Sequence, residues 1–142
     1  MNRVLLTGGS GRLGRYVYAS LLVQGFDVRN FDKVSWAGDI DQVQADILDR
    51  KRLESAMADR DVVIHLAALD AAVPATEQEF FEINVQGTWN VLEVAEKTSV
   101  QRVVLCSSVA ALGIGDEILP DYLPIDENHP CRPRQAYGLS KQ

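Results

Sequence analysis

Short apolar runs alternate along this chain with longer segments in which apolar residues recur at helical spacing. The runs predict buried strands at 3–8, 27–32, 43–47, 61–68 and 101–108. The segments between them predict helices at 12–25, 49–60 and 76–99, the last beginning with a capping box formed by Thr76 and Glu79. Strand followed by helix, repeated in this order, predicts an α/β fold: a doubly wound parallel sheet of Rossmann type with helices on both faces.

The remainder of the chain is less regular. From 109 to 136 the pattern gives way to a loop that contains glycine and proline, and residues 137–142 resemble the first turn of another helix. Neither an internal repeat nor a low-complexity linker divides the sequence. We therefore interpret residues 1–142 as one domain.

The first predicted strand is followed directly by a glycine-rich loop, "TGGSGRLG", at 7–14. It contains G-x-G-x-x-G at Gly9, Gly11 and Gly14, and equally G-x-x-G-x-x-G starting at Gly8. Such glycines can serve only as turn residues. Between a strand and a helix, however, they let backbone N–H groups approach a pyrophosphate whose charge is favoured at the helix N-terminus.

An acidic residue at the end of the next strand supports dinucleotide binding. Asp32 closes the strand at 27–32, where a carboxylate can accept hydrogen bonds from both hydroxyls of an adenosine ribose. The carboxylate would repel a 2′-phosphate, which favours NAD over NADP. Arg12, Arg15 and Lys33 lie nearby and could hold a phosphate, and the alternative for Asp32 is a solvated strand-end carboxylate.

Composition and charge exclude several other classes. Hydrophobic residues make up 46% and charged residues 24%, as in soluble globular domains, and the formal charge of −6 argues against a general nucleic-acid or anionic membrane surface. No apolar run is long enough for a membrane span and no signal peptide is visible, so we expect a cytoplasmic protein. Cys106 and Cys131 are expected to be free thiols, and the His, Cys and carboxylate spacing predicts no metal site.

A set of motifs then identifies the chain as similar to the extended short-chain dehydrogenase/reductase family of the NAD-dependent epimerase/dehydratase type. They are, in order, "TGGSGRLG" at 7–14, Asp32, "ADI" at 45–47, "VIHLAA" at 63–68, "NVQGT" at 84–88, "SSVA" at 107–110 and "ENHPCRPRQAYGLSK" at 127–141. The resemblance implies cofactor-binding roles for Gly8, Gly11, Arg12, Leu13, Gly14, Asp32, Asp46, Ile47, Leu66, Ala67, Ala68, Asn84, Tyr137 and Lys141.

Tyr137 and Lys141 also make physical sense as a proton-transfer pair. A phenol with a pKa of about 10 acts as a base at neutral pH only if its anion is stabilised. A lysine four residues further along a helix lies on the same face and brings a positive charge to the phenol. The resemblance implies that Ser108 orients a substrate oxygen, in preference to Ser107, while Tyr137 exchanges a proton with the substrate. The alternative for the tyrosine and the lysine is an ordinary surface pair.

The resemblance implies an NAD-dependent enzyme that acts on a sugar or sugar-nucleotide substrate and forms a homodimer through two helices of each subunit. Epimerase, uronate or aldose dehydrogenase and carbonyl reductase all stay open, whereas "SSVAALG" disfavours a dehydratase. A different class, the non-catalytic dinucleotide-binding sensor or interaction module, also stays open. Family members are normally considerably longer, with a C-terminal portion that completes the substrate pocket. We therefore expect these residues to bind NAD but to turn over little substrate by themselves.

Overall fold

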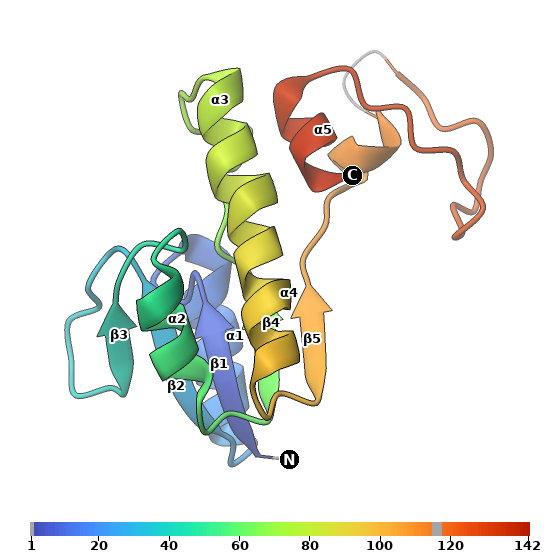
Figure 1. Ribbon diagram of the computed structural model, residues 1–142. Helices are drawn as coiled ribbons and strands as arrows, with labels where there is room; N and C mark the ends of the chain where they lie inside the picture. Colours follow the sequence, from blue (N-terminus) through green and yellow to red (C-terminus); the bar gives the residue numbers. More distant parts are fainter. Residues whose placement is uncertain (1, 115–117) are drawn as a thin grey trace.

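The computed structural model, which describes residues 2–114 and 118–142, contains a five-stranded parallel sheet (Figure 1). The strands are β1 Arg3–Thr7, β2 Asp27–Asp32, β3 Gln42–Gln44, β4 Val62–His65 and β5 Arg102–Leu105. Their spatial order is β3-β2-β1-β4-β5. The predicted doubly wound sheet is confirmed, and its order reverses between β1 and β4, the place where such sheets bind ligands.

The helices also follow the predicted pattern, with one internal change and with a short 3-10 helix at the start of the segment 109–136 that was predicted as a loop. They are α1 Arg12–Val23, α2 Arg50–Met57, α3 Glu77–Phe80, the π-helix η1 Phe81–Gln86, α4 Gly87–Lys97, the 3-10 helix η2 Val109–Leu112 and α5 Ala136–Lys141. The predicted helix at 76–99 is therefore three consecutive helical pieces. Its capping box is confirmed, because Thr76 accepts from the Glu79 N–H while the Glu79 carboxylate accepts from the Thr76 N–H.

Two apolar layers hold the helices to opposite faces of the sheet. On one face, Val4, Leu6 and Val28 pack with Tyr18 of α1. On the other face, strand residues pack with α2 and α4 in a cluster that includes Leu5, Phe31, Leu53, Met57, Val63 and Val91. Neighbouring residues of a strand point to opposite faces, so the continuous apolar run of β1 supplies both layers.

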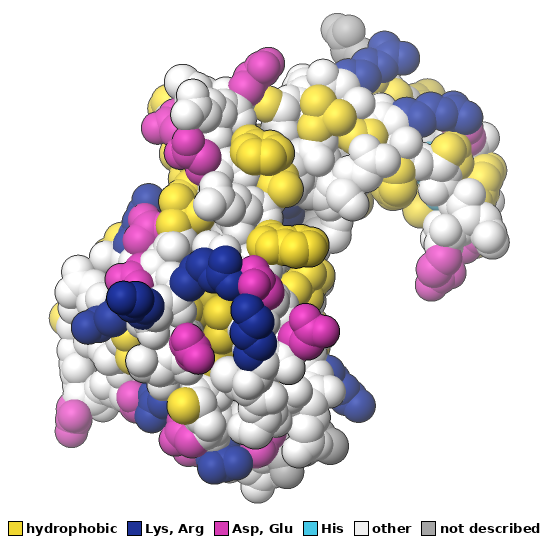
Figure 2. Space-filling model, viewed as in Figure 1, with side chains coloured by type: hydrophobic (Ala, Val, Ile, Leu, Met, Phe, Trp, Pro, Cys, Tyr) yellow, Lys and Arg dark blue, Asp and Glu magenta, His cyan; other side chains and the backbone are white. Residues whose placement is uncertain are grey.

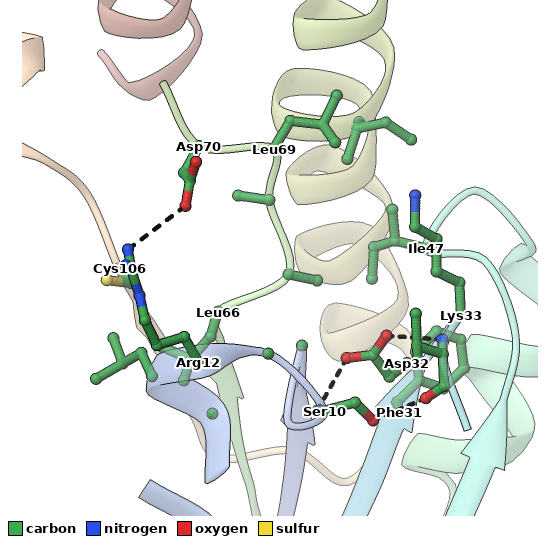
Figure 3. A pocket seen from close by; sticks show the side chains of 18 of the residues that line it. Ser10, Arg12, Phe31, Asp32, Lys33, Ile47, Leu66, Leu69, Asp70 and Cys106 are labelled. Carbon is green, nitrogen blue, oxygen red and sulfur yellow. Dashed lines mark hydrogen bonds and ion pairs between the residues drawn. The ribbon is translucent and has the colours of Figure 1, made fainter. Parts of the chain in front are cut away.

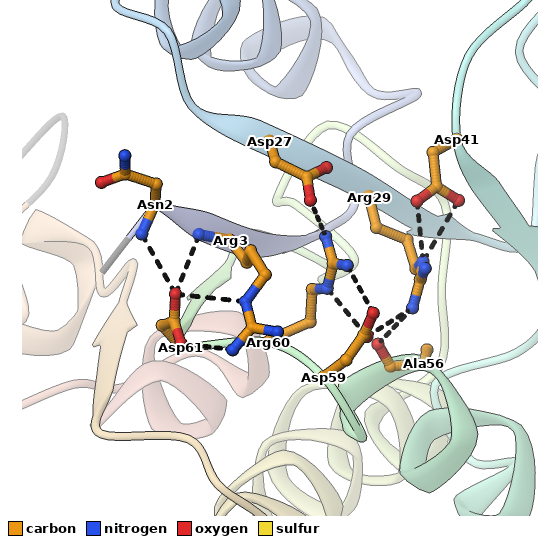
Figure 4. A network of polar contacts seen from close by, with 9 residues as sticks. All are labelled: Asn2, Arg3, Asp27, Arg29, Asp41, Ala56, Asp59, Arg60 and Asp61. Atoms are coloured by element: carbon orange, nitrogen blue, oxygen red, sulfur yellow. Dashed lines mark hydrogen bonds and ion pairs between the residues drawn. The ribbon is translucent and has the colours of Figure 1, made fainter.

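A network of ion pairs lies at the amino-terminal ends of the strands (Figure 4). The buried guanidinium of Arg60 contacts Asp59 at 2.7 Å and Asp27 at 3.2 Å, and Arg29 joins Asp59 to Asp41. The hydrogen bond from Arg60 is the main reason why the pKa of Asp59 falls to about 2. This network occupies the end of the sheet opposite to the glycine-rich loop, so we assign it to the stability of the fold.

The structure bears on three further expectations. Within residues 2–114 and 118–142, no helix is both long and apolar enough to cross a membrane. Cys106 and Cys131 are both exposed free thiols. We found no group of three or more His, Cys, Asp or Glu side chains in these same ranges that could hold a metal ion.

Candidate active site

A cavity of about 430 Å³ opens at the carboxyl ends of the strands, beside the glycine-rich loop (Figure 3). Every residue predicted to bind the cofactor lines it except Asn84, namely Gly8, Gly11, Arg12, Leu13, Gly14, Asp32, Asp46, Ile47, Leu66, Ala67, Ala68, Tyr137 and Lys141. These residues come from β2 and α5 and from the segments that follow β1, β3 and β4. Parallel strands bring their carboxyl ends together, which explains how residues so distant in sequence share one cavity.

The glycine-rich loop lies so close to neighbouring backbone that two of its glycines leave no room for a side chain. Gly8 has a φ of +74°, and a Cβ at this position would lie 2.5 Å from the backbone nitrogen of Ala67. A Cβ at Gly14 would collide with the backbone of Gly8 and Gly9. The loop therefore packs closely against β4 and α1, and the first turn of α1 opens on the cavity without an acidic residue.

The Asp32 carboxylate projects from the end of β2 towards the same loop (Figure 3). Its Oδ2 accepts the N–H of Ser10 at 3.0 Å, and its Oδ1 accepts the N–H of Val34 at 2.9 Å. A carboxylate oxygen can accept more than one hydrogen bond. Both oxygens therefore keep capacity for the hydroxyls of a ribose.

The three cations near this carboxylate are placed differently from one another. Arg15 donates to the carbonyl oxygen of Ser10, and its guanidinium lies 5.5 Å from the centre of the Trp36 ring. Arg12 lies 3.9 Å from Asp70, a loose and exposed pair (Figure 3), and Lys33 lines the cavity. Two of these cations thus have partners within the chain, which agrees with the preference for NAD that Asp32 predicts.

Tyr137 and Lys141 both line the other part of the cavity. The Lys141 ammonium donates to the carbonyl oxygen of Cys106 at 2.6 Å, and the Ser107 hydroxyl donates to the carbonyl oxygen of Lys141 at 2.9 Å. These bonds attach the end of α5 to the segment after β5. Burial lowers the pKa of Lys141 from its usual value. The Tyr137 ring packs on Phe80 with the ring centres 5.9 Å apart.

Of the two serines after β5, Ser107 lines the cavity, whereas Ser108 is not among the lining residues. The Ser108 oxygen accepts the N–H of Ala110 at 3.2 Å and caps η2. This bond uses the hydroxyl only as an acceptor, so its own O–H can still donate. The catalytic role of Ser108 stays a prediction.

Asn84 lies behind the cavity wall, in the π-helix η1. Its Oδ1 accepts the N–H of Leu69 at 2.8 Å, and its Nδ2 donates to the Leu69 carbonyl oxygen at 3.0 Å and to the Ser140 hydroxyl at 2.8 Å. Asn84 therefore joins the segment after β4 to α5, the helix that carries Tyr137 and Lys141. π-Helical turns are frequent at functional sites, and this one directs a single amide to two walls of the cavity.

A second buried polar chain runs beneath the glycine-rich loop. The Thr88 hydroxyl donates to the carbonyl oxygen of Asn84 at 2.6 Å, so its oxygen accepts from Nε2–H of His65 at 3.0 Å. The His65 Nδ1 must then accept the hydroxyl of Thr7 at 2.7 Å. Burial, with a smaller effect of the Lys141 charge, lowers the pKa of His65 to about 4. The histidine is neutral at physiological pH and packs as a structural residue.

Several lining residues were not singled out from the sequence as binding residues. They are Ser10, Phe31, Val34, Ala45, Leu69, Asp70, Ile83 and Cys106. All of them lie within two positions of a predicted site residue, so proximity along the chain could have indicated them. Ile83 precedes Asn84 in η1 and reaches the cavity, whereas the predicted residue Asn84 itself does not line it.

A parallel sheet with this strand order, a glycine-rich loop after β1 and a carboxylate at the end of β2 define a Rossmann-type fold, the class of fold that binds dinucleotides. The chain belongs to the NAD dependent epimerase/dehydratase family, whose model matches residues 4–142.

Two relatives and one solved structure illustrate the range of this family. The chain is 35% identical to the N-acetyl-alpha-D-glucosaminyl-diphospho-ditrans,octacis-undecaprenol 4-epimerase of Escherichia coli O157:H7, over 99% of this chain and 40% of that protein. It is 32% identical to the L-arabinose 1-dehydrogenase (NAD(P)(+)) of Haloferax volcanii, over 99% of this chain and 58% of that protein. A short-chain dehydrogenase/reductase superfamily protein from Agrobacterium tumefaciens, solved with bound NAD, superimposes with a TM-score of 0.87 at 36% identity, over 98% of this chain and 42% of that one.

These comparisons settle the class and the cofactor. The relatives include epimerases and dehydrogenases. The family is NAD dependent and the solved structure holds NAD, which agrees with the cofactor that Asp32 predicts. The chain spans 40% to 58% of the length of the proteins just named, so the activity of the whole protein is a separate question.

Proposed function

We propose that this chain is the cofactor-binding portion of an NAD-dependent epimerase or dehydrogenase that acts on a hydroxyl-bearing carbon of a sugar or sugar-nucleotide. The observation that supports this proposal is the convergence on one cavity of Asp32, the glycine-rich loop, Tyr137 and Lys141. A module that only senses dinucleotides needs the first two. Tyr137 and Lys141 are the residues that proton transfer requires in addition.

The chemistry follows from the groups in the cavity. Bound NAD supplies the hydride acceptor. Tyr137 takes the proton of the substrate hydroxyl as the carbon is oxidised, and it returns the proton when the carbonyl is reduced. Lys141, one helical turn away, favours the phenolate by its charge. Its ammonium has three N–H donors. The bond to the Cys106 carbonyl oxygen uses one of them and leaves two for the phenol oxygen of Tyr137 and the nicotinamide ribose.

The substrate oxygen needs a donor as well as a base. In our proposal, Ser108 donates to this oxygen and orients it towards Tyr137. Ser107 is the second candidate, because its hydroxyl lies at the cavity and already fixes the end of α5. Substituting each serine by alanine separates these two roles: loss of turnover with retained NAD binding identifies the donor.

Epimerase and dehydrogenase differ in what happens to the hydride. An epimerase returns it to the opposite face of the same carbon, so NAD is regenerated in each turnover. A dehydrogenase releases NADH and an oxidised sugar. Relatives of both kinds resemble this chain, and a carbonyl reductase would use the same pair of residues.

The test combines a binding and a turnover measurement. Calorimetry on the 142-residue chain should detect NAD binding. Sugars and sugar-nucleotides are then screened with NAD, on the polypeptide as its gene encodes it, by NADH absorbance and by chromatography of the products. We expect Tyr137→Phe still to bind NAD, because the other cofactor-binding residues are intact, but to lower turnover by at least about 100-fold, because general acid–base catalysis contributes about that much. Turnover that survives Tyr137→Phe would refute the proton-transfer role.

We also propose that the whole protein forms a homodimer through the helical face of α3, η1 and α4 together with α5. Figure 2 shows hydrophobic side chains gathered along these helices. They include Phe81, which is 60% exposed, Trp89, which is 64% exposed, and Leu139 of α5. An apolar face of this kind on adjacent helices favours association.

A further inference from the structure

Asn30 is a buried polar residue in the middle of β2, and its position needs a reason. It is only 1% exposed, and its Nδ2 donates to the Ser10 hydroxyl at 3.1 Å. Its Oδ1 has no hydrogen-bond donor among the residues that the structure describes. That oxygen lies against Gly9, where a Cβ would collide with it. A buried acceptor without a donor lowers stability, so an apolar side chain would suit the packing better.

The partner of Asn30 connects it to the cofactor site. The Ser10 hydroxyl donates to the carbonyl oxygen of Val34 at 2.7 Å, while the Ser10 N–H donates to Asp32 at 3.0 Å. The N–H of Val34 donates to the other oxygen of Asp32 at 2.9 Å. Figure 3 shows Ser10 and Asp32 facing one another beside the cavity. The two backbone segments that hold the carboxylate are thus joined to each other by the Ser10 hydroxyl.

Asn30 determines the direction of that hydroxyl. A serine has one O–H to donate, and its oxygen accepts through the remaining lone pairs. Because the Asn30 amide donates to this oxygen, the single hydrogen is directed to Val34. Ser10 is itself 8% exposed, so water has little access to replace either bond. A continuous chain of hydrogen bonds therefore runs from the core to the carboxylate, through Asn30, Ser10, Val34 and Asp32.

We propose that Asn30 is a positioning residue for the adenosine ribose of NAD: through Ser10 it fixes Asp32 so that the carboxylate accepts the ribose 2′-hydroxyl and rejects a 2′-phosphate. This proposal rests on NAD binding at the cavity, as the proposed function requires. A fixed carboxylate cannot turn away from a phosphate, and the two backbone donors leave each of its oxygens able to accept a further hydrogen bond. Asn30 thereby contributes to the choice between NAD and NADP without contacting either.

The test measures the part of the affinity that depends on the 2′-hydroxyl. Calorimetry gives the Kd of wild type, Asn30→Leu, Ser10→Ala and Asp32→Ala for three ligands: NAD, NAD with 2′-deoxyadenosine, and NADP. For wild type we expect the deoxy analogue to bind weaker by on the order of tenfold, as for a hydrogen bond to a charged group. The ratio that matters is the Kd for the 2′-deoxy analogue divided by the Kd for NAD. In Asp32→Ala these two Kd values should become equal.

Asn30→Leu and Ser10→Ala should each reduce the ratio to roughly two- to threefold and should raise the affinity for NADP relative to that for NAD. The reason is that a mobile carboxylate accepts the hydrogen bond for only part of the time. The double variant Asn30→Leu with Asp32→Ala should show the ratio of Asp32→Ala alone, because both changes act on one interaction. Asn90→Leu is the matched control. Asn90 is another buried asparagine, it donates to the Ile47 carbonyl oxygen at 3.3 Å, and its loss should leave the ratio unchanged.

The melting temperature separates positioning from stability. Asn30→Leu removes an acceptor without a donor, so the melting temperature should stay the same or rise while the ratio falls. If both Asn30→Leu and Ser10→Ala bind NAD with the wild-type ratio, the positioning role is wrong and the proposed function stands. If wild type binds no NAD, both are wrong. Ser10→Ala removes only a hydroxyl, so it decides the question even if Asn30→Leu fails to fold.

Discussion

The pH dependence of folding should be dominated near pH 5 by one residue, His65. The neutral imidazole accepts from Thr7 and donates to Thr88, and burial holds its pKa at about 4 against an ordinary value of 6.5. The unfolded chain therefore binds a proton between these two pH values while the folded chain does not. The contribution of His65 to the free energy of unfolding is therefore present above pH 6.5 and is lost as the pH falls towards 4.

The magnitude follows from the two pKa values. The full difference corresponds to about 3 kcal/mol, and about 2 kcal/mol of it should be lost between pH 7 and pH 5. Carboxylates act in a different window. The pKa of Asp59 and that of Glu93 are lowered from 3.8 and 4.5, respectively, to about 2 by hydrogen bonds from cations, so their contribution to stability is present above pH 4.5 and is lost as the pH falls towards 2.

The assay is urea unfolding at pH 7 and at pH 5 for wild type, His65→Gln and His129→Gln. Glutamine can accept from Thr7 and donate to Thr88 but does not titrate, so His65→Gln should lose most of the dependence on pH. His129→Gln removes the other histidine and shows how much of the dependence on pH is specific to His65. If His65→Gln loses as much stability as wild type between pH 7 and pH 5, the assignment of this dependence to His65 is refuted.

Two further predictions concern the glycine-rich loop and the helical face. Gly8→Ala should abolish NAD binding and destabilise the fold by more than Gly25→Ala. Both glycines have a positive φ, but only Gly8 lies against the backbone of another segment, whereas the space around Gly25 is open. Gly25→Ala should therefore lower the free energy of unfolding by about 1 kcal/mol and leave the Kd for NAD unchanged. Trp89→Glu should convert the dimer of the whole protein to a monomer in light scattering, and a dimer that persists would place the interface elsewhere.

Local sequence determined the elements and the chemistry that each one carries. Gly25 ends α1 with the positive φ that its lack of a side chain allows, and the capping box begins α3. The glycine-rich loop and Asp32 were recognisable for the same reason: both functions depend on a residue type at one point of a strand–loop–helix unit. The family resemblance added Tyr137 and Lys141, which do line the cavity.

Contacts between distant segments decided the rest, because no local pattern encodes them. The sequence predicted one uninterrupted helix over 76–99, but a π-helical turn places Asn84 between Leu69 and Ser140. The sequence also left Asn30 unremarked, since a single polar residue in a strand has no local signature.

The same distinction applies to the two serines after β5 and to the nearby cations. The family resemblance selects Ser108, yet the sheet and α5 bring Ser107 to the cavity. Arg15 is a candidate for a phosphate by charge alone, but packing places it beside Trp36. The sequence by itself thus determined the fold class, the cofactor and the candidate proton-transfer pair. Only the tertiary structure decided how the supporting residues are positioned, because their hydrogen bonds form between segments that are far apart in the chain until the sheet assembles.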